Sequence, residues 1–337
     1  MSVNFANSRA EFAIDFGTAN LRVIHRDDGV IFDEPSLCCL ADGEWGPALV
    51  AAGLPASEMS ERTPSGLRVR RPLKRGVLQD IGSATQLLRY AVPKVRRRHL
   101  FGTQRVIIGL PADATQAERR AMLTAAHDAG LNPLDLIPEP LAAAIGAGLA
   151  VREPRATMLV ECGAGTTEVA VLSLGGICQT RALRGGGDEL DQAIIDHLHF
   201  HHKLLVGRRS AERIKRALET AAQSANGKCS LIEVKGRSLV SGLPTSLWIP
   251  SAEIAGVAEK HAQHIVDLVR EVLGATTPEL SDDIHTHGIF LTGGGAALPA
   301  IRTMIEAQTG LGVTLADTPD QCVGRGLLQI LRGEQIN

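Results

Sequence analysis

Apolar runs separated by turn residues open the chain and predict a group of strands. Residues 12–16 and 21–26 are two such runs joined by a tight Gly-Thr-Ala-Asn turn, and residues 30–32 follow after an Asp-Asp-Gly turn. Short runs bounded by turn residues of this kind are typical of a β-meander. A continuous apolar run at 106–110 predicts a buried central strand, because a strand covered on both faces has no polar side.

Helix signals follow that central strand. Thr115 and Glu118 form the pattern of a capping box, in which a hydroxyl and a carboxylate accept backbone N–H groups at a helix start. Gly130 stands where a left-handed residue would end that helix. Residues 134–137 predict a short strand, and Glu139 then opens a helix of small residues, which allow close packing against another helix.

The second half of the chain repeats the order of elements that opens the first half. Groups of strands followed by helices with apolar residues at i, i+3 and i+4 predict a mixed α/β sheet covered on both faces. A segment rich in Gly, Pro, Ser and Glu at 41–71 predicts a small insertion outside the core. In the second half we expect strands at 158–161, 168–174, 177–183 and 289–292, and helices at 188–205, 210–225 and 251–273, with two short helices at the end.

Length and composition indicate an ordinary globular protein with two lobes. A chain of 337 residues suffices for two domains of about 150 residues each. Lys and Arg (35) nearly balance Asp and Glu (37), and only 3% of residues are aromatic, which argues against a nucleic-acid partner because base stacking needs aromatic rings. The six cysteines form no CxxC pair and are expected in the core in a reducing compartment. The chain shows no signal peptide and no bilayer-spanning apolar run, so we expect a cytoplasmic protein.

The main functional signal is a turn that occurs twice, each time after an apolar strand. Residues 15–20 (Asp-Phe-Gly-Thr-Ala-Asn) recur as residues 161–166 (Glu-Cys-Gly-Ala-Gly-Thr). Glycines let a backbone approach phosphate oxygens, N–H groups and hydroxyls donate to them, and an acid at the strand end holds Mg²⁺ through water. Either turn alone is better explained as a plain hairpin, but the repetition with the acid in register favours two turns that clamp one triphosphate. The predicted phosphate residues are Gly17, Thr18, Ala19, Asn20, Gly163, Ala164, Gly165, Thr166 and Thr167, and the predicted Mg²⁺ residues are Asp15 and Glu161.

Three further segments suit the same cleft. Residues 185–188 (Gly-Gly-Gly-Asp) precede a helix, so free N–H groups and a carboxylate are expected at a helix start, and the glycine-rich turn at 291–296 admits a flat ring or a sugar. Each of these could also be a plain turn. Glu212 and Lys215 lie on one helical face and form either a surface ion pair or a grip on a ribose and base edge. The predicted nucleotide residues of these segments are Gly186, Gly187, Asp188, Glu212, Lys215, Gly293, Gly294 and Gly295.

The order and spacing of these segments resemble the bacterial actin family MreB over nearly the whole chain. The resemblance is carried by residues 14–20, 71–77, 115–120, 139–149, 165–171, 211–215 and 291–295. It implies an α/β fold of the actin-like superfamily, which includes heat-shock chaperones and sugar kinases, with two lobes, four subdomains and ATP with Mg²⁺ in the cleft. The implied subdomains are IA (1–33, 75–143 and 318–337), IB (34–74), IIA (144–180 and 247–317) and IIB (181–246).

The resemblance also implies roles in ATP hydrolysis. It places Asp15 near the metal and makes Glu139, helped by Thr166, the residue that polarises the attacking water. The residues themselves agree, because a carboxylate that follows a buried strand and begins a proline-started helix is well placed to orient water for attack on a γ-phosphate. The alternative for Glu139 is a first-turn acid that complements the helix dipole.

The second turn departs from the family pattern. It has Glu161 where the family has an aspartate, and Ala164 where the family has a glycine. A glutamate reaches about one methylene further than an aspartate, and a methyl group at Ala164 narrows the approach of the backbone. We therefore expect nucleotide binding to survive and hydrolysis to be slowed.

A basic segment at 94–102 precedes the central strand and places Leu100 beside Phe101. Lys and Arg near anionic lipid contribute about 1 kcal/mol each, and inserted apolar side chains add to the binding. In the MreB family the corresponding loop contacts the membrane, and a filament that presents many copies would bind firmly through avidity. The alternative is a solvated basic loop in which Leu100 and Phe101 cover the domain edge.

Four histidines cluster near the end of one predicted helix. His197 and His201 are four residues apart, which is a spacing that metal sites on helices use, and His199 and His202 lie beside them. No carboxylate or cysteine occurs at a matching spacing, so exposed helical histidines without a metal are the expectation.

The resemblance implies a filament-forming cytoskeletal ATPase that is peripheral on the inner face of the cell membrane and organises cell shape and cell-wall synthesis. Its expected partners are further copies of this chain, the anionic membrane surface and membrane proteins of the cell-wall elongation machinery. The alternatives are a soluble sugar-kinase-like phosphotransferase, a non-polymerising regulatory ATPase and a chaperone motor. A kinase would need insertions for a second substrate, and a chaperone motor would need a peptide-binding domain after the ATPase; the sequence shows neither.

Overall fold

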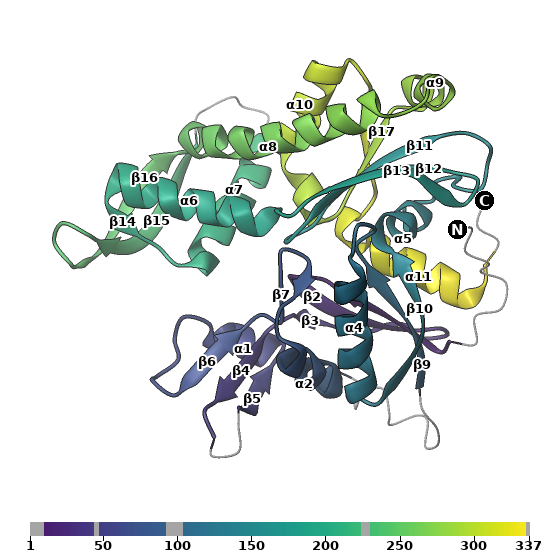
Figure 1. The fold of residues 1–337 in the computed structure, drawn as a ribbon. Helices are drawn as coiled ribbons and strands as arrows, with labels where there is room; N and C mark the ends of the chain where they lie inside the picture. The colour runs from purple at the N-terminus through teal and green to yellow at the C-terminus, as the bar shows by residue number, and fades with distance from the viewer. Residues whose placement is uncertain (1–9, 44–46, 92–103, 224–229, 335–337) are drawn as a thin grey trace.

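Two lobes, each built on a five-stranded sheet, make up the protein (Figure 1). The computed structural model describes residues 10–43, 47–91, 104–223 and 230–334. The first sheet has the order β10-β9-β1-β2-β3 and the second has the order β13-β12-β11-β17-β18. The strands of the first sheet are β1 (Phe12–Phe16), β2 (Asn20–His25), β3 (Gly29–Pro35), β9 (Gln104–Leu110) and β10 (Leu131–Pro138). Those of the second are β11 (Thr157–Cys162), β12 (Thr167–Ser173), β13 (Gly176–Leu183), β17 (Ile289–Thr292) and β18 (Val313–Leu315).

The two large sheets share one topology, which confirms the repeat in the sequence and the mixed α/β class. β1 pairs with β2 in antiparallel and with β9 in parallel, and β11 pairs with β12 and β17 in the same two ways. The register places Asp15 opposite Arg22, and Glu161 opposite Glu168. Because directly opposite residues of a strand pair project from the same face, the hairpin itself gives each acid a charged neighbour.

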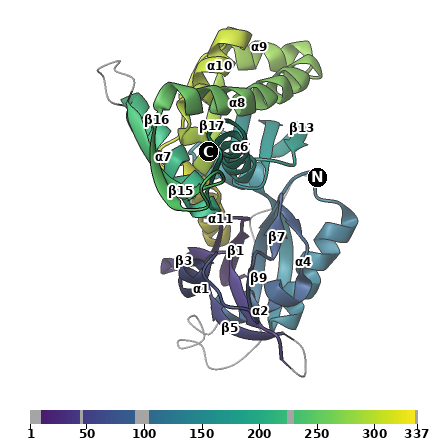
Figure 2. The same cartoon turned by 90° about the vertical axis from the view of Figure 1, so that its left-hand side faces the viewer.

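Two small three-stranded sheets protrude on the same side of the molecule, one from each lobe (Figure 1), and Figure 2 views them from that side. Much of the segment expected to be an insertion, residues 41–71, forms the small sheet of the first lobe. The small sheet of the second lobe contains a hairpin. The first consists of β4 (Cys38–Ala41), β5 (Ala48–Ala52) and β6 (Leu67–Arg70) with the helix α1 (Leu54–Met59), and the second consists of β14 (Leu204–Leu205), β15 (Leu231–Ser238) and β16 (Pro244–Pro250).

Helices cover the large sheets and complete the cores. In the first lobe, α2 and α4 pack on one face of the sheet, and in the second lobe α6, α7, α8, α9 and α10 enclose the second sheet and its small neighbour. The helices are α2 (Ile81–Ala91), α4 (Gln116–Asp128), α6 (Gly187–His202), α7 (Arg208–Gln223), α8 (Ser251–Gly274), α9 (Pro278–His287) and α10 (Pro299–Thr309). Shorter elements are the strand pair β7 (Leu73–Lys74) and β8 (Val77–Leu78) and the 3₁₀ turns η2 (Gly294–Ala297) and η3 (Pro319–Gln321).

A pair of helices, α5 (Glu139–Gly146) and α11 (Cys322–Arg332), joins the lobes. Their side chains and those of both large sheets form one continuous apolar cluster. The helices are so close that a Cβ added at Gly146 would lie 1.9 Å from a carbonyl oxygen of α11, and a Cβ at Gly326 would lie 1.8 Å from one of α5. The small residues predicted for the first of these helices are therefore needed where the lobes meet.

Most predicted elements are present, with differences at the ends and in the small sheets. The capping box of Thr115 and Glu118 is confirmed, and Gly130 has the left-handed φ of 84° expected after α4. The helix expected to reach residue 205 ends at His202, because Lys203 has a left-handed φ of 51° and the chain turns into β14. The hairpin of β15 and β16, the helices α2 and α9, and the strand β18 were not predicted.

Two expectations from the sequence concern the burial of the cysteines and segments that could span a bilayer. Of the five cysteines within the described residues, all are free and four are buried as expected, whereas Cys178 is exposed. None of the helices in the described ranges has the length and apolarity that crossing a bilayer requires. Leu100 and Phe101 lie outside the described residues.

Replacement of Gly326 by alanine should loosen the joint between the lobes. We expect Gly326→Ala to destabilise the protein by at least about 1–3 kcal/mol, because the added methyl group forces two backbones apart. Gly256→Ala is the matched control, since Gly256 lies within α8 with no atom in the way of a Cβ, and it should be neutral or slightly stabilising. Thermal unfolding of both variants checks this; equal melting temperatures would contradict the close packing.

Candidate functional site

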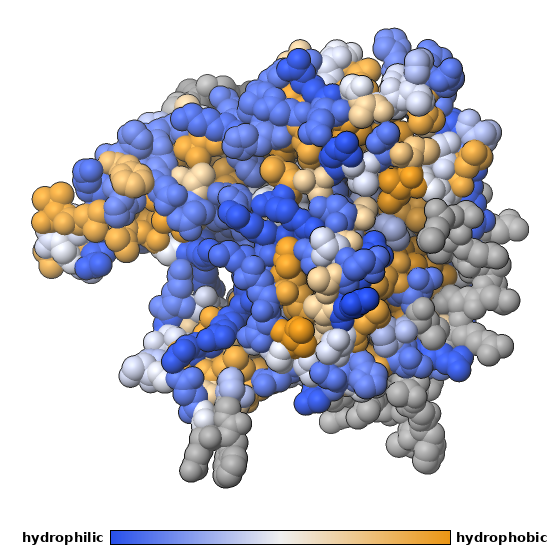
Figure 3. Space-filling model, viewed as in Figure 1, coloured by the Kyte–Doolittle hydropathy of each residue, from blue (hydrophilic) through white to orange (hydrophobic). Residues whose placement is uncertain are grey.

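A cavity of about 530 Å³ lies between the two lobes, a volume within the range of ligand sites. The space-filling view in Figure 3 shows a hollow between the lobes, with hydrophilic side chains along it. Elements of both lobes line the cavity, including the two glycine turns, the start of α5, and parts of α6, α7 and η2. Every residue predicted to bind phosphate, nucleotide or metal lines it, apart from Asp188.

The two glycine turns meet across the cavity. In the first turn, the carbonyl of Gly17 accepts the hydroxyl of Ser36 at 2.7 Å, which ties the turn to the end of β3. The Thr18 hydroxyl accepts the N–H of Gly76 at 3.2 Å. A Cβ at Gly165 of the second turn would lie 2.3 Å from the Thr18 oxygen. A glycine is therefore required where the turns approach one another.

The start of α6 lies against the second turn, which corrects the prediction of free N–H groups there. Gly187 donates its N–H to the carbonyl of Gly163 at 3.0 Å, and Asp188 donates to the carbonyl of Ala164 at 2.9 Å. The Asp188 carboxylate faces Arg71 at 3.4 Å, outside the cavity lining. These two donors thus hold the turn in place.

The third glycine segment packs onto the end of β11. Gly293 has a left-handed φ of 82°, and a Cβ there would lie 2.3 Å from the carbonyl oxygen of Cys162. Its N–H donates to Pro319 at 2.8 Å, which ties η2 to η3. At Gly294 the nearest atom to an added Cβ is 3.8 Å away, so the backbone faces the cavity with little cover.

Glu212 and Lys215 do not pair with each other, although both line the cavity. Lys215 forms an ion pair with Asp191 at 2.8 Å and donates to the carbonyl of Gly187 at 3.0 Å, while Glu212 pairs with Arg216 one turn along α7. The surface ion pair considered between Glu212 and Lys215 is therefore wrong. The Lys215 ammonium lies at the start of α6 and lines the cavity, where a negatively charged ligand would find it.

Four carboxylates face the centre of the cavity or lie directly behind it. Asp15 and Glu161 are the penultimate residues of the equivalent strands β1 and β11, Glu139 begins α5, and Glu168 lies opposite Glu161 in the hairpin. Oxygen atoms of Glu139, Glu161 and Glu168 lie within 4.8 Å of one another. Glu168 accepts the N–H of Ala112 at 2.8 Å, but one oxygen of Glu168 and one of Glu161 are buried without a hydrogen-bond partner.

Burial raises the pKa of every member of this cluster, and the charges of other members add to the effect for two of them. Burial, followed by the charges of the neighbouring carboxylates, raises the pKa of Glu139 and of Glu161 well above 4.5. Burial raises the pKa of Glu168 to about 8. Burial also raises the pKa of Asp15, against the opposing effect of Arg22. The cluster is therefore short of positive charge and would accept protons or a cation.

Arg22 is a cavity residue that sequence reasoning missed. It lies 3.4 Å from Asp15, pairs with Asp33 at 3.0 Å, and donates to the carbonyl of Asp320 at 2.7 Å. The signal that would have found it is the hairpin register, which places Arg22 opposite Asp15 just as Glu168 lies opposite Glu161. His261 of α8 is a further missed lining residue, and burial lowers its pKa to about 4, so its ring is neutral near pH 7.

These residues fit both Mg²⁺ and a phosphate-bearing ligand. Carboxylate oxygens are the ligands that Mg²⁺ prefers, and two of those present are buried without a partner. Glycine backbone and the Lys215 ammonium suit phosphate oxygens. Because phosphates and the four carboxylates repel each other, a divalent cation between them would neutralise both sides.

The duplicated lobes and the two turns that meet between them define the actin-like class of two-lobed proteins. Within that class, the model of the MreB/Mbl protein family matches residues 9–336. The chain is 38% identical over 319 residues to the cell shape-determining protein MreB of Escherichia coli (strain K12), covering 94% of this chain and 91% of that one. The chain therefore belongs to the MreB/Mbl family of cell shape-determining proteins.

Solved structures agree with this assignment. MreB5 of Spiroplasma citri, bound to AMPPNP, superposes with a TM-score of 0.87 at 29% identity over 95% of each chain. The same protein bound to ADP gives a TM-score of 0.87 at 30% identity over 94% of each chain. The MamK double helical filament has a TM-score of 0.74 at 21% identity, covering 95% of this chain and 97% of that one, and shows the shared fold.

The raised pKa of Glu168 predicts that the metal-free protein loses stability as pH rises. The pKa of this group is 4.5 when unfolded and about 8 when folded, so the folded state binds more protons between these values. Its contribution is thus present at low pH and is lost as pH approaches 8. Glu168→Gln keeps an acceptor for Ala112 and removes the charge, so its melting temperature should fall less than that of wild type between about pH 6 and pH 8.

Melting curves of both proteins in EDTA measure this difference. Glu259→Gln, on the exposed face of α8, is the control and should follow wild type. Parallel curves for all three proteins would show that the cluster does not hold an extra proton.

Proposed function

We propose that this protein is an ATP-dependent filament-forming cytoskeletal ATPase that acts at the membrane in cell shape and cell-wall synthesis. The observation that carries the proposal is the set of buried carboxylates enclosed by two facing glycine turns. The carboxylates of such a site repel each other, and a divalent cation that enters together with a nucleoside triphosphate would offset this repulsion. The AMPPNP and ADP complexes of a relative with the same fold support ATP as the nucleotide.

In this proposal Glu139 orients the attacking water and takes up its proton. Glu139 is the first residue of α5 and lines the cavity. Its raised pKa makes it a better proton acceptor than an ordinary carboxylate. The position at the first turn also complements the helix dipole, which is compatible with the catalytic role. Thr166, which lines the cavity at the end of the second turn, would hold the same water through its hydroxyl.

Asp15 and Glu161 would hold Mg²⁺ through water, and Glu168 behind them would strengthen the negative field. The ion would neutralise charge on the phosphates. Arg22 pairs with Asp15, so it would partly neutralise the carboxylate charge that the ion meets. The longer side chain of Glu161 and the methyl group of Ala164 alter the second turn, and we expect slow hydrolysis as a result.

Self-association would use exposed apolar surface on the small sheet of the second lobe. Val240, Leu243 and Trp248 of the β15–β16 hairpin are 84%, 63% and 63% exposed. In Figure 3 the orange tip of the upper arm marks this hairpin. Contiguous exposed apolar side chains are typical of a protein–protein contact, and a second copy of this chain is the partner that a filament requires.

Attachment to the inner face of the membrane remains a proposal from the sequence, through Leu100, Phe101 and the basic residues before them. Membrane proteins of the elongation machinery would be positioned by the attached filament. The four-subdomain division is likewise proposed. Because β16 pairs with β15 as far as Pro250, we place the end of subdomain IIB at that residue rather than at 246.

Replacement of Glu139 should separate binding from hydrolysis. Glu139→Ala should bind a fluorescent ATP analogue as tightly as wild type, while phosphate release falls by about 10²–10⁴-fold, the usual contribution of a general base. Glu161→Asp should increase the rate by restoring the shorter acid. Glu259→Ala serves as the control for loss of a carboxylate; unchanged hydrolysis in Glu139→Ala would remove this residue from the mechanism.

Filament formation is tested by sedimentation and electron microscopy with Mg-ATP, with ADP and without nucleotide, in the presence and absence of anionic vesicles. We expect nucleotide-dependent filaments that collect on the vesicles. Val240→Asp should reduce pelleting, because a charge enters the apolar contact, whereas Val30→Asp, an exposed valine of the first lobe, should not. A protein that binds ATP but stays monomeric throughout would instead be a non-polymerising regulatory ATPase.

A further inference from the structure

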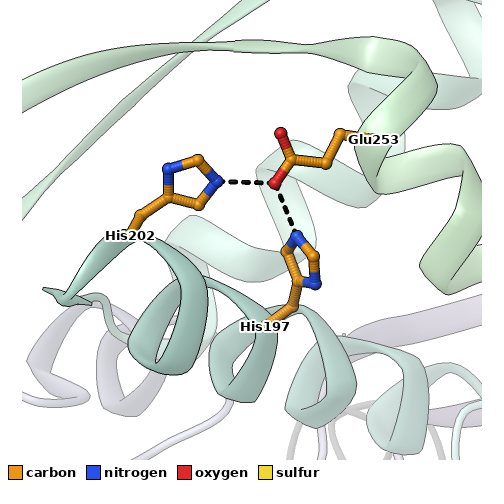
Figure 4. A group of neighbouring side chains, drawn as sticks. All are labelled: His197, His202 and Glu253. Carbon is orange, nitrogen blue, oxygen red and sulfur yellow. Dashed lines mark hydrogen bonds and ion pairs between the residues drawn. The ribbon is translucent and has the colours of Figure 1, made fainter.

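Two histidines and one glutamate converge outside the nucleotide cavity (Figure 4). His197 and His202 lie in the last two turns of α6, and Glu253 lies in the first turn of α8. The Nε2 atoms of both rings point to the same Glu253 oxygen, at 2.7 Å from His197 and 2.5 Å from His202. The carboxylate that is missing from the local sequence is thus supplied by α8, in which Glu253 lies 51 residues after His202.

The donor set is one that transition metals prefer. Two imidazole nitrogens and a carboxylate oxygen are typical ligands of Zn²⁺, which leave a fourth position for water. The three ligand atoms lie within 4.8 Å of one another. Mg²⁺ prefers oxygen ligands and would compete poorly for such a site.

The surroundings make the group more than a surface ion pair. The side chains are 19%, 27% and 31% exposed for His197, His202 and Glu253, so they are partly shielded yet open to an ion. Among the described residues, the Glu253 carboxylate has the two imidazoles as its partners. Its pKa lies below the ordinary value, chiefly because His202 and then His197 donate to it.

We propose that His197, His202 and Glu253 bind a divalent transition metal ion, with Zn²⁺ as the best match. On binding, each ring would offer the lone pair of Nε2 to the ion as a neutral imidazole with its one proton on Nδ1, and a ring that starts as imidazolium would release its second proton to water. Ligand atoms around tetrahedral zinc are about 3.3 Å apart for bonds of about 2.0–2.1 Å, so the rings need only move outward by less than about 1 Å.

The position of the ion gives it a structural consequence. α6 ends at His202 and α8 begins at Ser251, so the segment between them carries α7 and the small sheet β14-β15-β16. An ion held by both helices would close this segment at its base. Since α7 supplies Glu212 and Lys215 to the nucleotide cavity, the ion would steady one wall of that cavity without touching the ligand there.

Metal titration of tag-free protein tests the proposal. The protein is stripped with EDTA, returned to excess Mg²⁺ to occupy the carboxylate cluster, and titrated with Zn²⁺ by calorimetry. We expect one tight Zn²⁺ per chain in wild type and at least about a tenfold loss of affinity in His197→Ala, His202→Ala and Glu253→Gln. His199→Ala is the matched control, because His199 lies on the same helix with its ring against Phe200, and it should bind like wild type.

Two further measurements guard against variants that misfold or bind elsewhere. Zn²⁺ should raise the melting temperature of wild type and His199→Ala but not of the three site variants, whose circular dichroism should match wild type. Co²⁺ should give visible absorption bands in wild type that are lost in His197→Ala. Equal titrations for wild type and the site variants, or no tight Zn²⁺ in wild type, would overturn the proposal.

Discussion

Repulsion among buried carboxylates is the constraint on which the centre of this molecule depends. Glu139, Glu161 and Glu168 lie too close together for all three to be ionised without a cation. Their positions follow from backbone structure: a strand end, the residue opposite it in a hairpin, and the first residue of a helix. The fold thus brings together like charges that no local interaction favours, and the free energy of doing so must be offset when a ligand binds.

The helix pair between the lobes determines how ligand binding at the carboxylates can act on the rest of the molecule. Glu139 begins α5, and α5 packs against α11 so closely that glycine is needed on both helices. The same helices share one apolar cluster with both large sheets. Neutralisation of the carboxylates at one end of α5 therefore acts on the element that connects the lobes. Such a rigid connection favours movement of whole lobes over local adjustment, as is usual for tightly packed interiors.

The sequence predicted the fold and the outline of the site because both rest on repeated local patterns. Strands, a capping box and two glycine turns are local features, and their repetition identified Asp15 and Glu161 as equivalent. Arg22 and Glu168 were missed because their roles depend on which residues lie opposite in a hairpin. The register could have been derived from the two turns, since each pairs the acid with the residue seven positions later.

Other errors came from contacts between segments that are distant in the sequence. The N–H groups of Gly187 and Asp188 looked free, but the carbonyls of the second turn accept them. Lys215 and Glu212 matched as an ion pair by spacing, yet Asp191 and Arg216 are their partners. In the same way, the histidines of α6 lacked a carboxylate until α8 supplied Glu253.

The second turn shows how one substitution changes meaning in its tertiary context. By itself, Glu161 is a longer version of an aspartate that could still hold a hydrated ion. In the structure it lies opposite Glu168, whose pKa is already raised to about 8, and near Glu139. A longer acid brings its charge closer to these neighbours, which favours shared protons when metal is absent and raises the demand for a cation when nucleotide is present. The acid that departs from the family pattern is therefore coupled to the proposed water-orienting residue through charge, so its effect on hydrolysis need not depend on the position of the ion alone.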